Sequence, residues 1–325
     1  MEENIFEHRT DLSALKQSMK DIRDEMAKVI VGQQEVLHLL MIGLLCDGHV
    51  LIEGAPGVAK TLTAKLMAKV VDADFSRIQF TPDLMPSDVV GTSVFNPREG
   101  DFNFKPGPVF SNIILIDEIN RAPAKTQSAL FEVMEERQVT IDGTSHPMRF
   151  PFIILATQNP IEQEGTYRLP EAQLDRFIFK IEVHYPTLND EIAILNNQQG
   201  RTQAELLAEV NTVLSVAQLH HYRTLIHTVM VEQKLIAYIA RLVHETRHNA
   251  ALYLGASPRA SLAILRAAKA NAAIKGRDFV IPEDIKEMVT PVLRHRIMLT
   301  PEKEMEGLTA DELIETILKE AEVPR

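Results

Sequence analysis

The chain has 325 residues and a formal net charge of −11, so it is long enough for two domains with separate cores, and its acidic balance disfavours a sequence-independent grip on nucleic acid. Its single cysteine, Cys46, excludes an internal disulfide framework and fits a reducing compartment. The N-terminus lacks a secretory signal pattern and no apolar stretch approaches the ~18 residues that span a bilayer, so we expect a cytoplasmic protein without a membrane anchor.

Short apolar runs alternate with helical patterns over the first half of the chain, which predicts the α/β class with a doubly wound parallel sheet. An amphipathic helix at 12–29 precedes the runs, and further helices are predicted at 60–71 and 124–137. The runs that we predict as strands are His49–Glu53, Phe75–Phe80, Ile113–Asp117, Phe152–Thr157 and Phe177–Val183.

A loop of small residues follows the first run and precedes the helical pattern at 60–71. Its backbone N–H groups and the helix N-terminus suit phosphate binding, Lys60 adds a charge for the outer phosphates, and the Thr61 hydroxyl suits Mg²⁺. The pattern G-x-x-x-x-G-K-[ST] has glycine where this chain has Ala59, and a plain turn between strand and helix is the alternative. The predicted nucleotide-binding residues of the loop are Gly54, Ala55, Pro56, Gly57, Val58, Ala59, Lys60, Thr61 and Leu62.

The third apolar run ends in two carboxylates, Asp117 and Glu118. We expect Asp117 to bind Mg²⁺ through water, because Mg²⁺ usually keeps several waters, and Glu118 to polarise the attacking water as general base. The alternative is that Asp117 only caps the next helix. The phosphate-binding loop upstream favours a site for a nucleoside triphosphate and magnesium.

The segment from Thr81 to Asn112 is too long for an ordinary connection and is predicted to be an inserted functional element. Further along, residues 138–150 alternate apolar and polar side chains around Asp142-Gly143, a dipeptide typical of a tight turn. These residues predict a β-hairpin, for which a plain edge hairpin without a further role is the alternative.

Beyond residue 185 the pattern is helical only, so we divide the chain into an α/β domain at 1–185 and a smaller all-helical domain at 186–325. Thr187 and Asp190 predict a capping box, and Ser257 predicts the cap of a later helix. Arg259 lies in the first turn of that helix, where a cation opposes the helix dipole, and is either a ligand for an anion or a plain exposed arginine. The predicted helices are 192–199, 204–213, 232–249 and 259–275.

Several segments form a recognisable set of motifs, which are Ile30–Gln33, Gly54–Thr61, Thr81–Asp88, Asp117–Ala122, Ala156–Pro160, Leu169–Phe177 and Gly255–Arg259. Together they resemble the MoxR-type AAA+ ATPases over nearly the whole chain. Several of these motifs are long and follow one another in the order that this family uses, and alanine at position 59 resembles the family's own variant of the phosphate loop.

The resemblance implies ATP and Mg²⁺ as ligands and ATP hydrolysis as the activity. It assigns Asn159 to the sensor-1 position, which orients the attacking water, although a plain turn residue is the alternative there. Arg176 matches the arginine finger, which reaches the neighbouring subunit's site and stabilises transition-state charge. Arg259 matches sensor 2, a lid arginine that contacts the γ-phosphate, and the backbone at Val31 and Gly32 is expected to line the adenine pocket.

The resemblance also identifies residues 94–110 with the helix-2 insert and residues 138–150 with the pre-sensor-1 hairpin, where contact with a substrate or partner is expected. It implies a homo-oligomeric ring, expected to be hexameric, that remodels or activates a partner protein in a chaperone-like manner. Proteins with a von Willebrand factor A domain are the expected partner class. Arg168 stands where the family pattern has proline, which leaves open whether Arg168 or Arg176 acts across the interface. Arg121 is a separate candidate for a role there.

Two other functions are compatible with a nucleotide site. A nucleotide-gated scaffold with negligible turnover is disfavoured by Glu118, Asn159 and Arg176, because a pure binder needs none of the three. A nucleic-acid motor is disfavoured by the acidic balance and by the lack of an appended basic or zinc-ribbon domain.

A zinc metalloprotease is a further alternative, because the segment His244–His248 matches the H-E-x-x-H signature within a predicted helix. No third ligand is evident in the sequence, and the helix falls in the predicted lid. We therefore interpret these side chains, and the pair His220-His221, as solvated polar residues.

Overall fold

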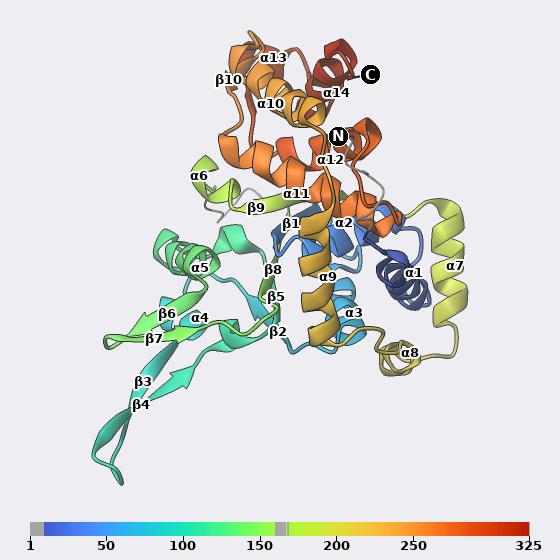
Figure 1. Ribbon diagram of the computed structural model, residues 1–325. Coiled ribbons are helices and arrows are strands. Elements are labelled where there is room, and N and C mark those ends of the chain that lie inside the picture. Colours follow the sequence, from blue (N-terminus) through green and yellow to red (C-terminus); the bar gives the residue numbers. More distant parts are fainter. Residues whose placement is uncertain (1–9, 160–166, 168, 325) are drawn as a thin grey trace, which may run out of the picture.

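A computed structural model gives the structure of residues 10–159, 167 and 169–324 (Figure 1). Its centre is a five-stranded parallel sheet, which confirms the predicted doubly wound α/β fold. All the carboxyl ends of the strands meet at one edge, the edge at which open parallel sheets bind ligands. From one side to the other the strands are β2 (Phe75–Gln79), β5 (Ile113–Asp117), β8 (Ile153–Gln158), β1 (His49–Gly54) and β9 (Phe177–Val183).

Alternate side chains of each strand pack on opposite faces of the sheet, as the pleat requires. Val50 and Leu115 join the core on one face, whereas Leu51 and Ile114 join a second core on the other face. Both faces are covered by helices, which explains why the strands are continuous apolar runs. The first core includes α1 (Ser13–Ala27), α2 (Gln34–Leu45) and α3 (Lys60–Val70), and the second includes α4 (Pro86–Val90) and α5 (Ala124–Glu136).

Two antiparallel hairpins project from the side of the sheet that α4 and α5 cover (Figure 1). They are tied together by a hydrogen bond from Ser93 Oγ to Asp142 Oδ2, at 2.5 Å, and by the Phe104 and His146 rings, which stack with centroids 4.1 Å apart. The first hairpin covers most of the predicted insert at 94–110 but already begins at Gly91. The elements of this region are β3 (Gly91–Asn96), β4 (Asp101–Pro106), η1 (Pro108–Phe110), η2 (Ile119–Arg121), β6 (Gln138–Ile141), β7 (Thr144–Pro147) and α6 (Glu171–Leu174).

After β9 the chain is mostly helical, as predicted. The Thr187 and Ser257 hydroxyls accept hydrogen bonds from the backbone N–H groups of Asp190 and Arg259, so both predicted helix caps are formed. A short antiparallel ribbon, β10 (Leu252–Leu254) with β11 (Met298–Leu299), was not predicted. The helices are α7 (Leu188–Gln198), α8 (Gln203–Glu209), α9 (Val216–Thr228), α10 (Gln233–His248), α11 (Pro258–Ile274), α12 (Pro282–Leu293), α13 (Pro301–Met305) and α14 (Ala310–Glu320).

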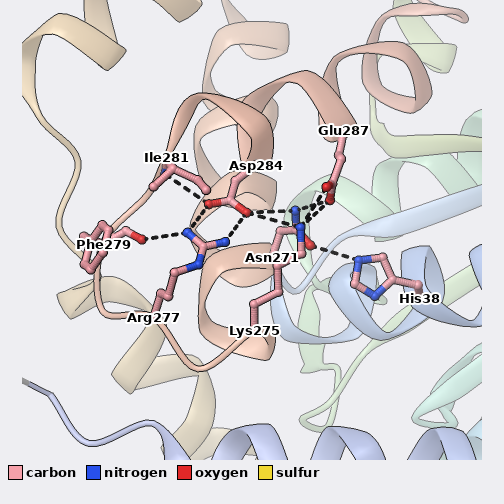
Figure 2. Close-up of polar contacts among 8 residues, drawn as sticks. All are labelled: His38, Asn271, Lys275, Arg277, Phe279, Ile281, Asp284 and Glu287. Carbon is pink, nitrogen blue, oxygen red and sulfur yellow. Dashed lines mark hydrogen bonds and ion pairs between the residues drawn. The ribbon is translucent and has the colours of Figure 1, made fainter. Parts of the chain in front are cut away.

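A buried polar cluster ties α2 to α11 and α12 (Figure 2). Asp284 is fully buried, and its two carboxylate oxygens each accept a hydrogen bond of 2.6 Å from the guanidinium of Arg277. Asn271 donates to Asp284 at 3.3 Å and to Glu287 at 2.7 Å. The side-chain oxygen of Asn271 lies 2.9 Å from His38 Nε2 on α2. The helical half is thereby joined to the sheet by polar contacts as well as by a shared apolar core.

Replacement of Asp284 by alanine is expected to lower the free energy of unfolding by about 3–5 kcal/mol, because Arg277 and Lys275 lose a buried carboxylate partner. Urea unfolding followed by circular dichroism measures this change. Glu283→Ala is the control, since Glu283 is exposed in the same turn of α12. Equal stability of the two variants would contradict the structural role of the cluster.

His49, at the start of β1, is buried and held in one tautomer. Its Nδ1 accepts a hydrogen bond of 3.0 Å from the N–H of Ile154, so its Nε2 carries the proton that faces the Met134 carbonyl at 3.3 Å. Burial, and secondly the nearby Arg137, lower the pKa of His49 to about 4. The folded chain therefore resists protonation of this imidazole.

Acidification is expected to destabilise the protein through His49. Between pH ~6.5 and ~4 the unfolded chain binds a proton at this position that the folded chain does not, which lowers the free energy of unfolding by roughly 3 kcal/mol as the pH falls. Below this window the group adds no further change. Unfolding free energies from pH 7 to 4 measure the slope, and His49→Gln should reduce it in part, because burial also lowers the pKa of His295 well below its usual value. An unchanged slope in the variant would contradict this assignment.

Candidate active site

The phosphate loop joins the carboxyl end of β1 to the start of α3, as the sequence predicts. Ala59 adopts the left-handed conformation with φ of 61°, so the position that favours glycine is occupied by alanine at a cost of roughly 1–2 kcal/mol. Gly57 has φ of 86°, and Gly54 lies so close to β9 that a Cβ would stand 2.6 Å from the Val183 carbonyl oxygen. The loop is therefore packed closely against β9 at Gly54 and open at Gly57, and it lies at the N-terminus of α3.

Lys60 and Thr61 are the first two residues of α3, where backbone N–H groups have no partner within the helix. The Lys60 ammonium donates to the Gly54 carbonyl at 2.6 Å across the loop. Its pKa is lowered by partial burial, while Asp117, Glu118 and Glu53 oppose that shift. The loop thus presents one half-buried cation and a helix N-terminus, which together suit a chain of phosphates.

Asp117 ends β5 and is buried. Its Oδ1 accepts from the Thr157 hydroxyl at 3.1 Å, and its Oδ2 lies 2.6 Å from Arg77 Nε of the adjacent strand. The Asp117 carboxylate and the Thr61 hydroxyl are oxygen donors of the kind that Mg²⁺ prefers, so the side chains present fit the expected metal.

Glu118 follows in the left-handed conformation, with φ of 57°, which turns the chain sharply at the end of the strand. Its N–H donates to the Thr157 hydroxyl at 3.0 Å. Its carboxylate is held by Gln79 Nε2 at 2.8 Å and by Arg121 Nε at 3.1 Å. Arg121, expected to compete for a role across the interface, therefore contacts the carboxylate of its own chain.

A cavity of about 170 Å³ lies between the phosphate loop and these carboxylates. It brings together the predicted residues Lys60, Asp117, Glu118 and Asn159, so the notion of one polar site is supported by their placement. Arg77, Gln79 and Thr157 were missed by sequence reasoning. The sequence carries only a weak signal for them. Polar residues within or beside apolar runs can be assigned to the site only when it is known that β2 pairs with β5 and β5 with β8. The lining residues are Pro56, Lys60, Arg77, Gln79, Asp117, Glu118, Thr157 and Asn159.

The two remaining predicted arginines lie elsewhere. Arg259 Nη2 is 2.9 Å from one carboxylate oxygen of Glu135, and Arg176 Nη1 is 3.8 Å from the other. Arg176 also donates to the Phe131 carbonyl, and its Nε is buried without a hydrogen-bond partner among the described residues. Both arginines line a cavity of about 350 Å³ together with His49, at the amino end of β1.

The phosphate loop and this arginine pair are thus at opposite ends of β1. The first and last Cα atoms of a six-residue strand are about 17 Å apart, since five steps of ~3.3 Å separate them. The expectation that Arg259 contacts the γ-phosphate is not met within one chain, because α11 packs its N-terminus beside α5 and not above the phosphate loop. Arg168 lies outside the described residues.

Val31 and Gly32, the predicted adenine contacts, lie at the entrance to α2. Gly32 has φ of 77°, and a Cβ there would stand 2.5 Å from the Asp190 carboxyl carbon. The next residue, Gln33, donates to the Val58 carbonyl at 3.1 Å and so links this segment to the phosphate loop.

The zinc-protease alternative is not supported by the arrangement of the histidines. His244 and His248 stack on each other with ring centroids 4.2 Å apart, and His248 Nδ1 contacts the His244 carbonyl at 3.0 Å. In the part of the chain that the structure describes, no three His, Cys, Asp or Glu side chains are grouped to hold a metal ion. His220 meets the Phe150 ring edge-on at 5.0 Å.

Over the same described residues, none of the helices is both long enough and apolar enough to cross a membrane.

Comparison with known proteins places this geometry in a family. The family model described as "ATPase family associated with various cellular activities (AAA)" matches residues 49–179, and the one described as "AAA lid domain" matches residues 244–317. A crystal structure described as a "putative ATPase" from Cytophaga hutchinsonii is 45% identical, with a TM-score of 0.89 over 96% of this chain and 97% of that chain.

Similar protein sequences support the same family. "Chaperone MoxR1" of Mycobacterium tuberculosis is 44% identical over 93% of this chain and 81% of its own length. "Uncharacterized protein YeaC" of Bacillus subtilis is 44% identical over 93% of each chain, and "Protein MoxR" of Paracoccus denitrificans is 30% identical over 87% of this chain and 89% of its own. The sheet with its phosphate loop, the acidic pair at the end of β5 and these relatives lead to one conclusion: the chain belongs to the MoxR-type AAA+ ATPases.

Proposed function

We propose that this protein hydrolyses ATP with Mg²⁺ in sites shared between neighbouring subunits of a ring, expected to be a hexamer, and uses the cycle to remodel a partner protein. The observation that carries this proposal is the division of the site. One chain holds the phosphate loop and the acidic pair at one end of β1, and the arginine pair at the other end. In a ring, the arginine end of one subunit can complete the loop end of the next.

The residues at the loop end have separable roles. The loop N–H groups and Lys60 hold the phosphates, Thr61 and Asp117 hold Mg²⁺, and Glu118 accepts a proton from the attacking water. Mg²⁺, when bound, neutralises charge on the phosphate oxygens. Asn159 lines the same cavity and, as a neutral amide, can orient the water.

The carboxylate of Glu118 is already occupied in the free chain. Gln79 Nε2 and Arg121 Nε both contact its Oε2 atom. In the proposed mechanism Arg121 moves away from this oxygen when nucleotide and a neighbouring subunit are in place.

The arginine end supplies positive charge across the interface. Arg176 and Arg259 both form ion pairs with the carboxylate of Glu135. In the proposed ring, the phosphate oxygens bound by a neighbouring subunit replace this carboxylate. In other NTPases an arginine supplied in this way is worth ~10³ to 10⁵ in rate. We assign Arg259 to the neighbour's nucleotide, beside Arg176, because its own loop is about a strand length away.

Partner remodelling rests on the relatives and on the exposed surface. The relative from Mycobacterium tuberculosis is named a chaperone, and the hairpin β3–β4 presents Phe95 and Phe102 at 50% and 63% exposure. Their rings are 5.3 Å apart and form an apolar patch that a protein partner can cover. A von Willebrand factor A domain is the partner class that we propose for this surface.

Two alternatives have less support. A scaffold without turnover needs neither Glu118 held at 2.8 Å by Gln79 nor an arginine pair at a distant face. A motor on nucleic acid needs a basic track, whereas the chain carries a net charge of −11.

Glu118→Gln is expected to leave ATP affinity unchanged and to lower turnover at least about 100-fold, because the general base is lost while the phosphate loop is intact. Lys60→Ala should weaken binding as well as turnover. Nucleotide titration and steady-state phosphate release measure the two quantities, with Lys65→Ala as control, since Lys65 is exposed on the same helix. Turnover at the parent rate in Glu118→Gln would remove Glu118 from the mechanism.

Activity per chain is expected to rise with protein concentration and to fall by ~10³-fold in Arg176→Ala. Arg241→Ala, an exposed arginine of α10, is the matched control. A mixture of Arg176→Ala with Glu118→Gln should regain activity, because the second variant presents an intact arginine to the loop end of the first. A mixture as inactive as its components would refute the shared site.

A further inference from the structure

Asp175, the residue before Arg176, is held on both sides by the helical lid. Its Oδ1 accepts from Arg296 Nε at 2.7 Å, and its Oδ2 accepts from the Ser257 hydroxyl at 2.8 Å. The carboxylate belongs to the short segment between α6 and β9, whereas both donors belong to the lid. Two separate lid elements therefore converge on a single core side chain that adjoins the proposed finger.

The Ser257 hydroxyl continues this connection to the second arginine. Ser257 is the N-cap of α11, and its oxygen accepts from the N–H of Arg259 at 3.1 Å while its hydrogen is donated to Asp175. A hydroxyl has one donor and two acceptor sites, so it can do both at once. Asp175, Ser257 and Arg259 form a continuous chain of hydrogen bonds.

Arg296 fixes the other side of Asp175. Its side chain is 3% exposed, and it also donates to the backbone carbonyls of Phe177 at 2.6 Å and Ile178 at 3.1 Å. These carbonyls begin β9, the strand that follows Arg176 directly. The turn after α12 is thus fastened to the segment that carries the finger.

We propose that Asp175 is a positioning residue that sets the spacing between Arg176 and Arg259, so that lid movement is transmitted to the arginine pair offered to the neighbouring subunit. This inference rests on the proposed role of both arginines across the interface. Arg176 belongs to the core and Arg259 to α11, and Glu135 contacts both while the lid is docked at Asp175. When the lid undocks from Asp175, the guanidinium groups of Arg176 and Arg259 move apart. The phosphate of the neighbouring subunit's nucleotide then contacts one of these cations and no longer both.

Ser257→Ala is the sharpest test, because it removes one hydrogen bond to Asp175 and leaves the buried Arg296–Asp175 ion pair in place. Substitution of Asp175 or Arg296 would leave a buried charge unpaired and would disturb folding. Ser215→Ala is the control, since the Ser215 hydroxyl also caps a helix, α9, by accepting from the N–H of Gln218, and it does not contact Asp175. Ser257→Thr retains a hydroxyl that can cap the helix.

We expect Ser257→Ala to lower kcat about tenfold with unchanged nucleotide affinity, which corresponds to the loss of one well-placed hydrogen bond. Ser257→Thr should stay within about threefold of the parent, and Ser215→Ala should keep the parent kcat although it loses a helix cap of similar worth. Phosphate release at saturating ATP and fluorescent-nucleotide titration give the two readouts. Unfolding midpoints of the two alanine variants show whether the loss of cap stability is matched.

Mixed rings identify the subunit in which the defect lies. Lys60→Ala subunits bind ATP poorly but present an intact arginine pair, so their mixture with Ser257→Ala should exceed the weighted mean of the two activities. A mixture at the weighted mean, or equal kcat in Ser257→Ala and Ser215→Ala while Arg176→Ala is inactive, overturns this inference and leaves the shared site standing. Full activity in Arg176→Ala overturns the shared site, and this inference with it.

Discussion

The length of one strand separates the two groups of residues to which we assign the proposed activity. Strand β1 places the phosphate loop at its carboxyl end and a pair of arginines beside its amino end, about 17 Å apart for six residues. Because β1 is hydrogen-bonded to β8 on one side and to β9 on the other, adjustment of a loop cannot close this gap. The proposed assembly into a ring follows from that stiffness, since charge that develops on a bound phosphate needs cations from a second chain.

Every charged group of the proposed site has a substitute partner within the chain. Lys60 contacts the Gly54 carbonyl, Arg77 contacts Asp117, and Arg259 contacts Glu135. The Arg77 and Arg259 side chains are about half exposed, so each of their ion pairs contributes only roughly 0–1 kcal/mol, but the pairs fix where these side chains lie before nucleotide and neighbours arrive. Their exchange for phosphate and metal has a further effect. In the proposed cycle, each ion pair that breaks would free its second side chain, such as Glu135, so that a change of nucleotide would reach residues beyond the loop.

Much of this arrangement could be predicted from local sequence patterns, and the remainder depends on packing between distant segments. The five strands, the phosphate loop and the position of Asp117 follow from short apolar runs that end in polar residues. Helix α2 was not predicted, because nine of its twelve residues are buried and it shows no continuous polar face. The contacts of Arg77 with Asp117 and of Arg259 with Glu135 join residues 40 and 124 positions apart, which no local pattern can reveal.

Helix α5 has a mechanical consequence for the whole subunit. It starts just after Arg121, which contacts Glu118, and near its last turn Glu135 meets the two arginines. Directly after it begins β6, the root of the second hairpin, which is joined to the first hairpin through Asp142 and His146. A helix of 13 residues is a rigid rod of roughly 20 Å. In the proposed ring, nucleotide bound at one end of a subunit and a neighbour docked at the other would contact residues joined by this same helix, and a tilt of the helix would move the hairpins that follow it.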